Sequence, residues 1–301
     1  MGPDAGLSQY RWRVPELPEV EALVLDLSRR LDGRAIVRVD IAAFSCLKTY
    51  DPPISALSGG MVDGVSRHGK FLDIDVSGTH LVLHLARAGW IRWREEVPAL
   101  PPRPSSKSPL AARIVLDNGA GLDITEAGTR KSLALYVVRS PSEVEGVARL
   151  GPDPLADEFT AEVLGAILEH EGRAQIKGVL RHQSNIAGIG NAYSDEVLHA
   201  ARMSPFKPAS SLTEEELQTL HEAIRTVLGD AVARSAGLAA SELKGEKKSH
   251  MAVHGRAGQD CPVCGDTVRE VSFADSSLQY CPTCQTGGKP LADRRMSRLL
   301  K

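Results

Sequence analysis

Residues 261–284 read CPVCGDTVREVSFADSSLQYCPTC, and the two Cys-Pro-x-Cys pairs in this stretch predict a metal-binding module. Sixteen residues separate the two pairs, and a glycine follows the first pair. Four thiolates at this spacing suit tetrahedral coordination of one zinc ion, because each pair can form a tight turn that brings two sulfurs to the same metal. Disulfides and free buried thiols are the alternatives. The cysteines expected to bind one structural Zn²⁺ in a zinc ribbon are Cys261, Cys264, Cys281 and Cys284.

The composition is that of an ordinary globular protein. Of 301 residues, 42% are hydrophobic, 25% are charged and 4% are aromatic, which excludes a disordered chain and makes two or three domains the first expectation. The sequence contains no apolar run of the length that spans a membrane, and MGPDAGLSQYRWRV at the start lacks the apolar core of a secretory signal. We therefore expect a cytoplasmic protein without a membrane partner, which favours zinc over disulfides. The fifth cysteine, Cys46, is expected to be a plain thiol.

Helical periodicity dominates the region before the cysteine module. Apolar residues recur at helical spacing in four segments, and Ser211 or Thr213 can cap the last one. The four segments are residues 157–172, 175–183, 191–203 and 211–235. A hydrophilic stretch, residues 240–258, then leads into the cysteine module.

The first half of the chain has a different pattern, in which one amphipathic helix precedes many short strands. Residues 18–31 place an apolar stripe on one helical face, and Gly33 ends the helix. The alternating strand segments that follow, with glycine turns between several of them, are residues 35–44, 70–78, 80–85, 89–93, 112–119, 121–125 and 132–138. They predict a β-sandwich or flattened barrel, with residues 98–109 as an exposed loop rich in proline and serine.

A glycine-rich turn precedes one of the predicted helices, in NIAGIGNAYSDE, residues 185–196. Backbone amides at such a turn can bind an anion, and Asn191 could cap the helix while its side chain donates to a phosphate. A helix-turn-helix packed for structural reasons is the plain alternative. Lys177 and Arg181 lie before the turn, where they could contact phosphates or remain solvated on a helix surface.

Residues 15–21 read PELPEVE, which alone predicts only a rigid lead into a helix with Pro18 in its first turn. Four further motifs accompany it in order: RHGK at 67–70, LGPDPLADEF at 150–159, IAGIGNAYSDE at 186–196 and CPTCQ at 281–285. Together these motifs resemble the formamidopyrimidine-DNA glycosylase and endonuclease VIII family, whose mature chains begin with P-E-L-P-E-V-E. The resemblance extends from residue 15 to residue 285.

The resemblance implies an α+β multidomain fold that clasps duplex DNA. Its parts are an N-terminal β-sandwich with a flanking amphipathic helix, a helix-two-turn-helix domain and a C-terminal zinc ribbon. The boundaries we expect are 15–138 for the catalytic sandwich, 139–157 for a linker, 158–240 for the helix-two-turn-helix domain, and 241–301 for the zinc ribbon with a basic tail.

The resemblance also implies a base-excision-repair DNA glycosylase with AP lyase activity, which removes oxidised bases after flipping them out of the duplex. In this scheme Pro15 is the nucleophile, Glu16 the general acid, Lys70 a phosphate and catalytic contact, and Asn191 a phosphate clamp. A terminal secondary amine has a pKa of about 8, so part of it is unprotonated at neutral pH and can form an iminium with C1′. Outside the family context, Lys70 would be a solvated charge at a strand edge.

Residues 1–14 conflict with this chemistry. The nitrogen of Pro15 inside a peptide bond is an amide without nucleophilic character. Val14 directly precedes it, and a GUG codon is read as Val internally but as Met at initiation. We therefore expect residues 1–14 to be a misannotated extension that the native protein lacks.

Two further positions depart from the family. The ribbon position that normally holds a phosphate-binding Arg is Ser276. The candidates to replace that contact are the basic residues beyond the last cysteine, Arg294, Arg295, Arg298 and Lys301. The strand that normally ends in a void-filling Met reads HLARAG, with Arg87 at the Met position, and Arg130 is the nearest candidate for the arginine of the next loop. Lesion choice, opposite-base preference and β or β,δ elimination therefore stay open.

The expected partner is damaged double-stranded DNA, bound by a monomer. The alternative is a non-catalytic DNA-damage-binding paralogue that keeps the zinc ribbon and the phosphate clamp without a free proline amine. Net charge is -2, while residues 241–301 carry ten basic and seven acidic side chains. The excess of basic residues is thus local and modest. We therefore expect DNA affinity to decrease only slightly as the salt concentration rises.

Overall fold

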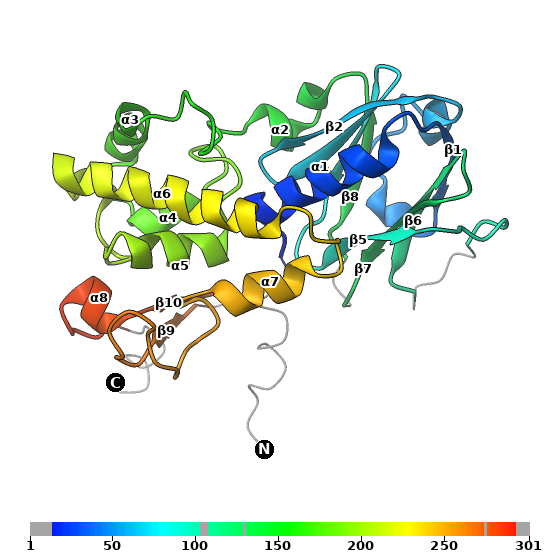
Figure 1. The fold of residues 1–301 in the computed structure, drawn as a ribbon. Helices are drawn as coiled ribbons and strands as arrows, with labels where there is room; N and C mark the ends of the chain where they lie inside the picture. The colour runs from blue at the N-terminus through cyan, green and yellow to red at the C-terminus, as the bar shows by residue number, and fades with distance from the viewer. Residues whose placement is uncertain (1–13, 103–107, 129–130, 274–275, 293–301) are drawn as a thin grey trace. The chain divides into compact units, whose positions relative to one another are not determined.

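The computed structural model describes residues 14–102, 108–128, 131–273 and 276–292 (Figure 1). Contacts between Cα atoms divide the chain into two compact units. The N-terminal unit comprises residues 1–150 and 234–245, and the C-terminal unit comprises residues 151–233 and 246–301. This division differs from the boundaries expected from the sequence, because residues 139–150 group with the strands and the cysteine module groups with the helices before it.

Two antiparallel sheets of four strands form the N-terminal unit. Their strand orders are β2-β3-β4-β8 and β1-β6-β7-β5. The strands are β1 (Ile36–Ile41), β2 (Val62–His68), β3 (Phe71–Val76), β4 (Thr79–His84), β5 (Gly89–Arg94), β6 (Leu110–Leu116), β7 (Gly121–Glu126) and β8 (Ala134–Val138). The β-rich first half predicted from the sequence is confirmed.

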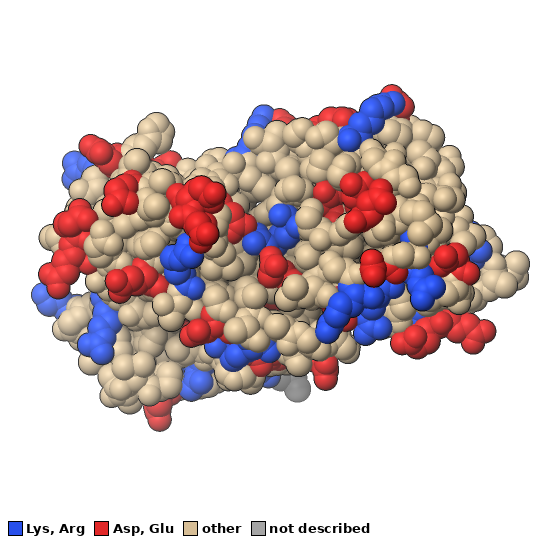
Figure 2. All heavy atoms as spheres, turned by 45° about the horizontal axis from the view of Figure 1, so that its top comes forward, with Lys and Arg blue, Asp and Glu red and all other residues tan. Residues whose placement is uncertain are grey.

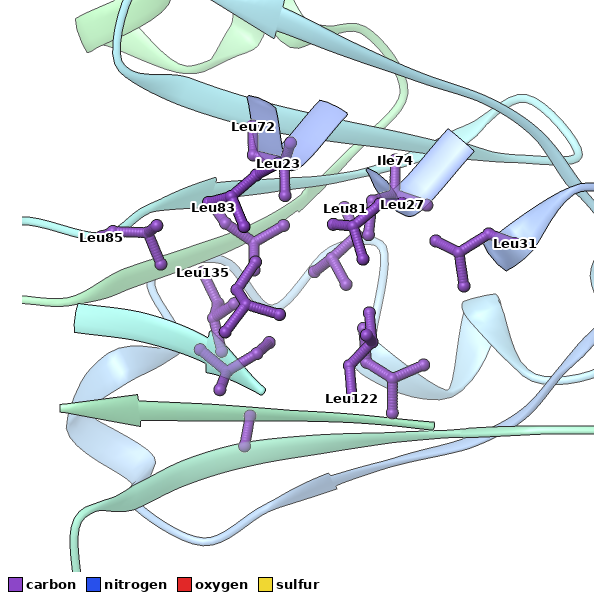
Figure 3. Close-up of a cluster of buried hydrophobic side chains, with 14 of the residues drawn as sticks. Leu23, Leu27, Leu31, Leu72, Ile74, Leu81, Leu83, Leu85, Leu122 and Leu135 are labelled. Atoms are coloured by element: carbon purple, nitrogen blue, oxygen red, sulfur yellow. The ribbon is translucent and has the colours of Figure 1, made fainter. Parts of the chain in front are cut away.

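Helix α1 (Leu17–Leu31) packs into the same core through the face that the sequence predicts. Leu23, Leu27 and Leu31 are each no more than 1% exposed. They share one cluster of buried side chains with Leu83 of the first sheet and Leu122 of the second (Figure 3). Burying a leucine contributes about 2 kcal/mol, so this stripe anchors the helix and thereby fixes where its first turn lies.

Strand β2 is absent from the segments expected from the sequence. Its residues, VDGVSRH, contain Gly64, and Val62 is their one buried side chain. An edge strand of this kind lacks the apolar alternation that reveals a strand in sequence, and glycine weakens the signal further. The short helical segments of this unit are η2 (Phe44–Cys46), η3 (Ile54–Leu57), η4 (Pro141–Glu143) and α2 (Glu145–Ala148), and the last two lie in the expected linker.

The C-terminal unit combines helices with a small hairpin. Its elements are α3 (Ala161–Glu171), α4 (Ile176–Arg181), α5 (Asn191–Ala200), η5 (Ala209–Ser211), α6 (Glu214–Ser235), β9 (Arg269–Ser272), β10 (Ser277–Tyr280) and α8 (Pro282–Thr286). Helix α5 begins at Asn191, as the sequence predicts. Thr213 caps α6, because its Oγ1 accepts from the Glu216 amide at 3.2 Å while Glu216 Oε2 accepts from the Thr213 amide at 2.9 Å.

Helix α7 (Leu243–His250) occupies the hydrophilic stretch for which the sequence shows no helical pattern. Lys247 holds one of its inward positions, is 4% exposed, and places Nζ 4.8 Å from the centre of the Tyr193 ring. A cation on an aromatic ring can replace an apolar side chain, which hides the periodicity. None of the described helices is long and apolar enough to cross a membrane.

Candidate functional site

The residues at the start of α1 are fixed by a reciprocal capping box. Glu16 is the N-cap residue and is 2% exposed. Its backbone N–H donates to Glu19 Oε2 at 2.8 Å, while its side chain accepts from the Glu19 amide. Pro15 precedes it and is also buried. The capping box therefore fixes the carboxyl of the residue that directly follows Pro15, and the nitrogen of Pro15 is an amide as long as Val14 is attached.

The RHGK turn is tied to the same helix by an ion pair. Arg67 Nε donates to Glu21 Oε2 at 2.7 Å, and the two residues are 46 apart in sequence. Gly69, with φ of 55°, turns the chain into β3, and Lys70 follows directly. Sequence reasoning did not single out Arg67 or Glu21, although each lies in a quoted motif and they carry opposite charges. The pair joins the two motifs that carry the expected catalytic residues.

His84 lies in the electrostatic field of Lys70. It is opposite Phe71 in the first sheet, and the two ring centres are 4.6 Å apart. Burial and, as the smaller cause, the positive charge of Lys70 together lower the pKa of His84 to about 4. The imidazole is therefore neutral at pH 7, and His84 adds no positive charge to that of Lys70.

Arg87 is exposed on a tight turn between β4 and β5. The Gly89 amide donates to the Leu85 carbonyl oxygen at 2.8 Å, and a Cβ at position 89 would lie 2.1 Å from that oxygen. The turn thus requires glycine at position 89 and presents Arg87 from a rigid base. Arg130 lies outside the described residues. Two residues after it, the amide of Ser132 donates to Glu126 Oε1 at 2.7 Å.

The glycine turn before α5 is braced by a side chain that the sequence did not reveal. Gln183 Oε1 accepts the Gly188 amide at 3.0 Å, and Gln183 Nε2 donates to the Ile189 carbonyl at 2.8 Å. Gly188 has φ of 88°, which a glycine adopts readily. The N-cap is Gly190 and not Asn191, which corrects the expected capping role.

Asn191 is half-buried and links α5 to the ribbon hairpin. Its Nδ2 donates to the Ser277 carbonyl at 2.8 Å, and its buried Oδ1 has no hydrogen-bond partner among the described residues. An amide nitrogen carries two hydrogens, so one donor can still serve a phosphate. Ser276, beside Ser277, is exposed in the turn between β9 and β10. Arg294, Arg295, Arg298 and Lys301 lie outside the described residues.

Lys177 is not a surface cation. It is 5% exposed, and its Nζ lies 2.6 Å from Asp195 Oδ1 and 2.7 Å from Ser194 Oγ. A buried ammonium needs a paired carboxylate, and Asp195 supplies it. The structure therefore gives Lys177 a structural partner in place of the suggested phosphate contact or solvated helix face.

Two buried acids of α5 hold the segment that leads into the ribbon. Asp195 Oδ2 lies 2.7 Å from His254 Nδ1. Glu196 accepts the backbone amides of residues 252–254 at 2.7–3.0 Å, while burial raises the pKa of its carboxyl. The sequence signal was the adjacent Asp-Glu pair inside a predicted helix, because acids that are buried there need hydrogen-bond partners.

The four cysteines fit a tetrahedral zinc site. The Sγ atoms of Cys264 and Cys281 are 3.3 Å apart, and those of Cys261 and Cys284 are 3.9 Å apart. Zinc–sulfur bonds of about 2.3 Å place tetrahedral sulfurs about 3.8 Å from one another. Burial is the main cause that raises the pKa of the Cys281 thiol to about 11, so a cation is what would hold it as a thiolate. Cys46 is buried in the hydrophobic core of the N-terminal unit.

Charged side chains of both signs cover the surface. On the face drawn in Figure 2, acidic and basic residues are interspersed. This mixture agrees with the net charge of -2 and with the expectation that any excess of basic residues is local. Phosphate contacts would then depend on individually placed donors such as the Asn191 amide.

The sequence matches three family models in succession. Residues 14–133 match the formamidopyrimidine-DNA glycosylase N-terminal domain, residues 150–242 match the formamidopyrimidine-DNA glycosylase H2TH domain, and residues 258–287 match a zinc finger found in FPG and IleRS. The zinc-finger match covers all four cysteines and supports one structural zinc ion.

Known proteins resemble this chain over half of its length or more. A formamidopyrimidine-DNA glycosylase of Symbiobacterium thermophilum is 35% identical over 294 residues, which covers 94% of this chain and 93% of the relative. An uncharacterized formamidopyrimidine-DNA glycosylase-like protein of Mycobacterium tuberculosis is 62% identical over 152 residues, 50% of this chain and 94% of the relative. The Lactococcus lactis formamidopyrimidine-DNA glycosylase, crystallised non-covalently bound to DNA containing an AP site, aligns with a TM-score of 0.77 at 25% identity, over 90% of this chain and 99% of that chain.

Proposed function

Because this chain belongs to the formamidopyrimidine-DNA glycosylase family, we propose that it removes oxidised bases from duplex DNA and then cleaves the abasic site through an amine at Pro15. Membership of the family supports a DNA glycosylase that acts in DNA repair. The oxidised base as substrate, the lyase step and the free amine of Pro15 are our proposal. The observation that carries it is the capping box, which fixes the carboxyl of Glu16, the residue after Pro15, at the start of a helix anchored in the core.

In the first step, the nitrogen of Pro15 takes the place of the base on C1′. The unprotonated Pro15 nitrogen attacks C1′, the glycosidic bond breaks, and its electron pair leaves with the base, which takes up a proton. Glu16 then protonates O4′ as the C1′–O4′ bond breaks, and loss of the amine proton leaves an iminium between Pro15 and C1′. Glu16 is 2% exposed, which would limit the access of water to this proton transfer.

The second step cleaves the strand. The iminium withdraws electrons from C2′, so a base can remove its proton. The electron pair of that C–H bond then forms a C2′=C3′ double bond while the C3′–O bond breaks, so the phosphate leaves with the electrons of the broken bond and the iminium at C1′ is retained. The ammonium group of Lys70 would neutralise the charge of that phosphate. The Arg67–Glu21 pair would position Lys70 for this role, because it ties the turn that carries Lys70 to α1. Water then hydrolyses the iminium and restores the amine.

This mechanism requires Pro15 to be the first residue. The native chain would then lack residues 1–14, with translation starting at the codon for Val14. The match to the N-terminal family model begins at residue 14, which supports this proposal. Mass spectrometry of the native protein tests it, and an intact Met1 or Gly2 terminus would contradict it.

The C-terminal unit would position the DNA. Asn191 would donate its second amide hydrogen to a backbone phosphate next to the damaged nucleotide. The relative bound to AP-site DNA supports duplex DNA as the partner. Arg87, exposed on its rigid turn, would enter the space left by the flipped base, and Arg130 is proposed for the same region.

Base release from a defined duplex tests the proposed function. A chain that starts at Pro15 is incubated with duplexes that contain one formamidopyrimidine lesion or none, and the freed base is measured by mass spectrometry. We expect release from the damaged duplex alone. Glu16→Gln retains an oxygen for the Glu19 amide, so it should fold normally and lose about 100-fold in rate. Binding without base release would overturn the proposal.

A further inference from the structure

Helix α5 presents one polar stripe to the zinc-binding segment of its own unit. Asn191, Asp195 and His199 are spaced four apart and therefore share one helical face. Asn191 donates to the Ser277 carbonyl, and Asp195 Oδ2 accepts the Gln279 amide at 3.3 Å. The first two positions thus bind the ribbon hairpin, and the third reaches the metal-binding cysteines.

His199 is buried against the predicted zinc ligands. It is 5% exposed, and its Nε2 lies 3.3 Å from Cys261 Sγ. Among the described residues, this sulfur is the one hydrogen-bond partner of the ring. A ring nitrogen of His199 also lies within 4.8 Å of the sulfurs of Cys281 and Cys284.

The chemistry of the site favours a hydrogen bond over direct coordination. Four cysteines already close a tetrahedral zinc site and leave no open position for a fifth ligand. Four thiolates and one Zn²⁺ carry a net charge of -2, and Cys261 and Cys281 are at most 2% exposed. A buried negative charge needs donors in place of water, and a neutral imidazole supplies one N–H without adding a charge.

We propose that His199 is a positioning residue of the zinc site. Its Nε2–H donates to the Cys261 thiolate, stabilises the bound metal and couples zinc occupancy to α5. Because α5 begins at Asn191, loss of zinc would also disturb the proposed phosphate clamp at the other end of the helix.

Zinc release to a colorimetric chelator tests the hydrogen bond directly and does not depend on catalysis. His199→Phe fills the space without a donor, and we expect it to release zinc about tenfold faster than the unaltered protein. His199→Gln can place an amide N–H near the position of Nε2, so it should release zinc at nearly the original rate. His221→Phe is the matched control, since His221 is in the same unit and its Nε2 bonds the Phe159 carbonyl at 2.7 Å.

Two outcomes would overturn the proposal. The first is equal zinc release from His199→Phe and the unaltered protein. The second concerns the Co²⁺-substituted protein, whose visible absorption bands should be those of four thiolate ligands with or without His199. A shift of these bands in His199→Phe would mean that the imidazole is itself a ligand. Circular dichroism of each zinc-loaded variant verifies that it remains folded.

Discussion

The two units bury their polar groups in different ways. In the N-terminal unit the buried pair of Arg113 and Asp123 joins β6 and β7 of the second sheet, whereas the residues proposed for catalysis lie at the start of α1 and at the turn before β3. In the C-terminal unit the buried polar residues hold the same helix that carries the proposed phosphate clamp. Asp195, Glu196 and Lys177 are each no more than 7% exposed and hold helix α5 to the segments around it.

This difference indicates how function depends on stability in each unit. The N-terminal unit can lose a functional side chain and keep its core. In the C-terminal unit, the residues that organise the proposed phosphate clamp also hold the fold together, because a buried charge without its partner costs several kcal/mol. Variants of the two units should therefore separate loss of chemistry from loss of structure.

Removal of a zinc ligand should have the largest effect. Cys281→Ser takes away a fully buried thiolate, and structural zinc contributes about 10 kcal/mol or more to small modules. We expect the ribbon to unfold and DNA affinity to be lost, as measured by metal content and fluorescence anisotropy with a damaged duplex. Cys46→Ser is the control, because Cys46 is buried in the other unit, and it should retain one zinc ion. Unchanged DNA affinity in Cys281→Ser would contradict the zinc assignment.

Breaking the Lys177–Asp195 pair should have the next largest effect. Lys177→Met leaves a buried carboxylate with one partner fewer, and we expect the free energy of unfolding to fall by about 3–5 kcal/mol. The matched variant Arg139→Met breaks the exposed pair with Asp51 and should cost less than about 1 kcal/mol. Urea denaturation measures both. Equal losses would show that the buried network does not support the C-terminal unit.

The Arg67–Glu21 pair should have an intermediate effect. Glu21 keeps 26% of its side chain exposed, so its carboxylate can recover some hydration in Arg67→Met. We expect a loss of about 1–2 kcal/mol in stability and slower strand cleavage, because the turn that carries Lys70 is released. Arg29→Met, which removes a largely exposed arginine of α1, is the control. Normal cleavage in Arg67→Met would contradict the proposed link between the two motifs.

Lys70→Met should have the smallest effect on stability, within about 0.5 kcal/mol, since the side chain is half-buried at a turn. We expect strand cleavage to fall by about 100-fold. The pKa of His84 should rise from about 4, because a positive charge that lowers it is gone, yet stay below its usual range because burial is the larger cause. NMR titration of the His84 ring measures this, and an unmoved pKa would place Lys70 away from His84.

The sequence predicted the features that depend on local pattern. The apolar stripe of α1, the start of α5 at Asn191 and the four cysteines all follow from spacing along the chain. Sequence reasoning failed where a polar residue takes an inward position. Lys247 conceals α7, and Lys177 was expected at a surface although it is buried against Asp195. The Arg67–Glu21 pair depends on how α1 packs against β2, which no local pattern specifies.

The central claim is that Pro15 acts through a free secondary amine. Borohydride trapping on a duplex with an abasic site tests it most directly, with a chain that starts at Pro15 compared with the full chain, after intact mass confirms each terminus. The account predicts a covalent protein–DNA adduct for the chain that starts at Pro15 and none for the chain that retains residues 1–14. Equal trapping by both chains would contradict it, because an amide at Pro15 cannot form an iminium.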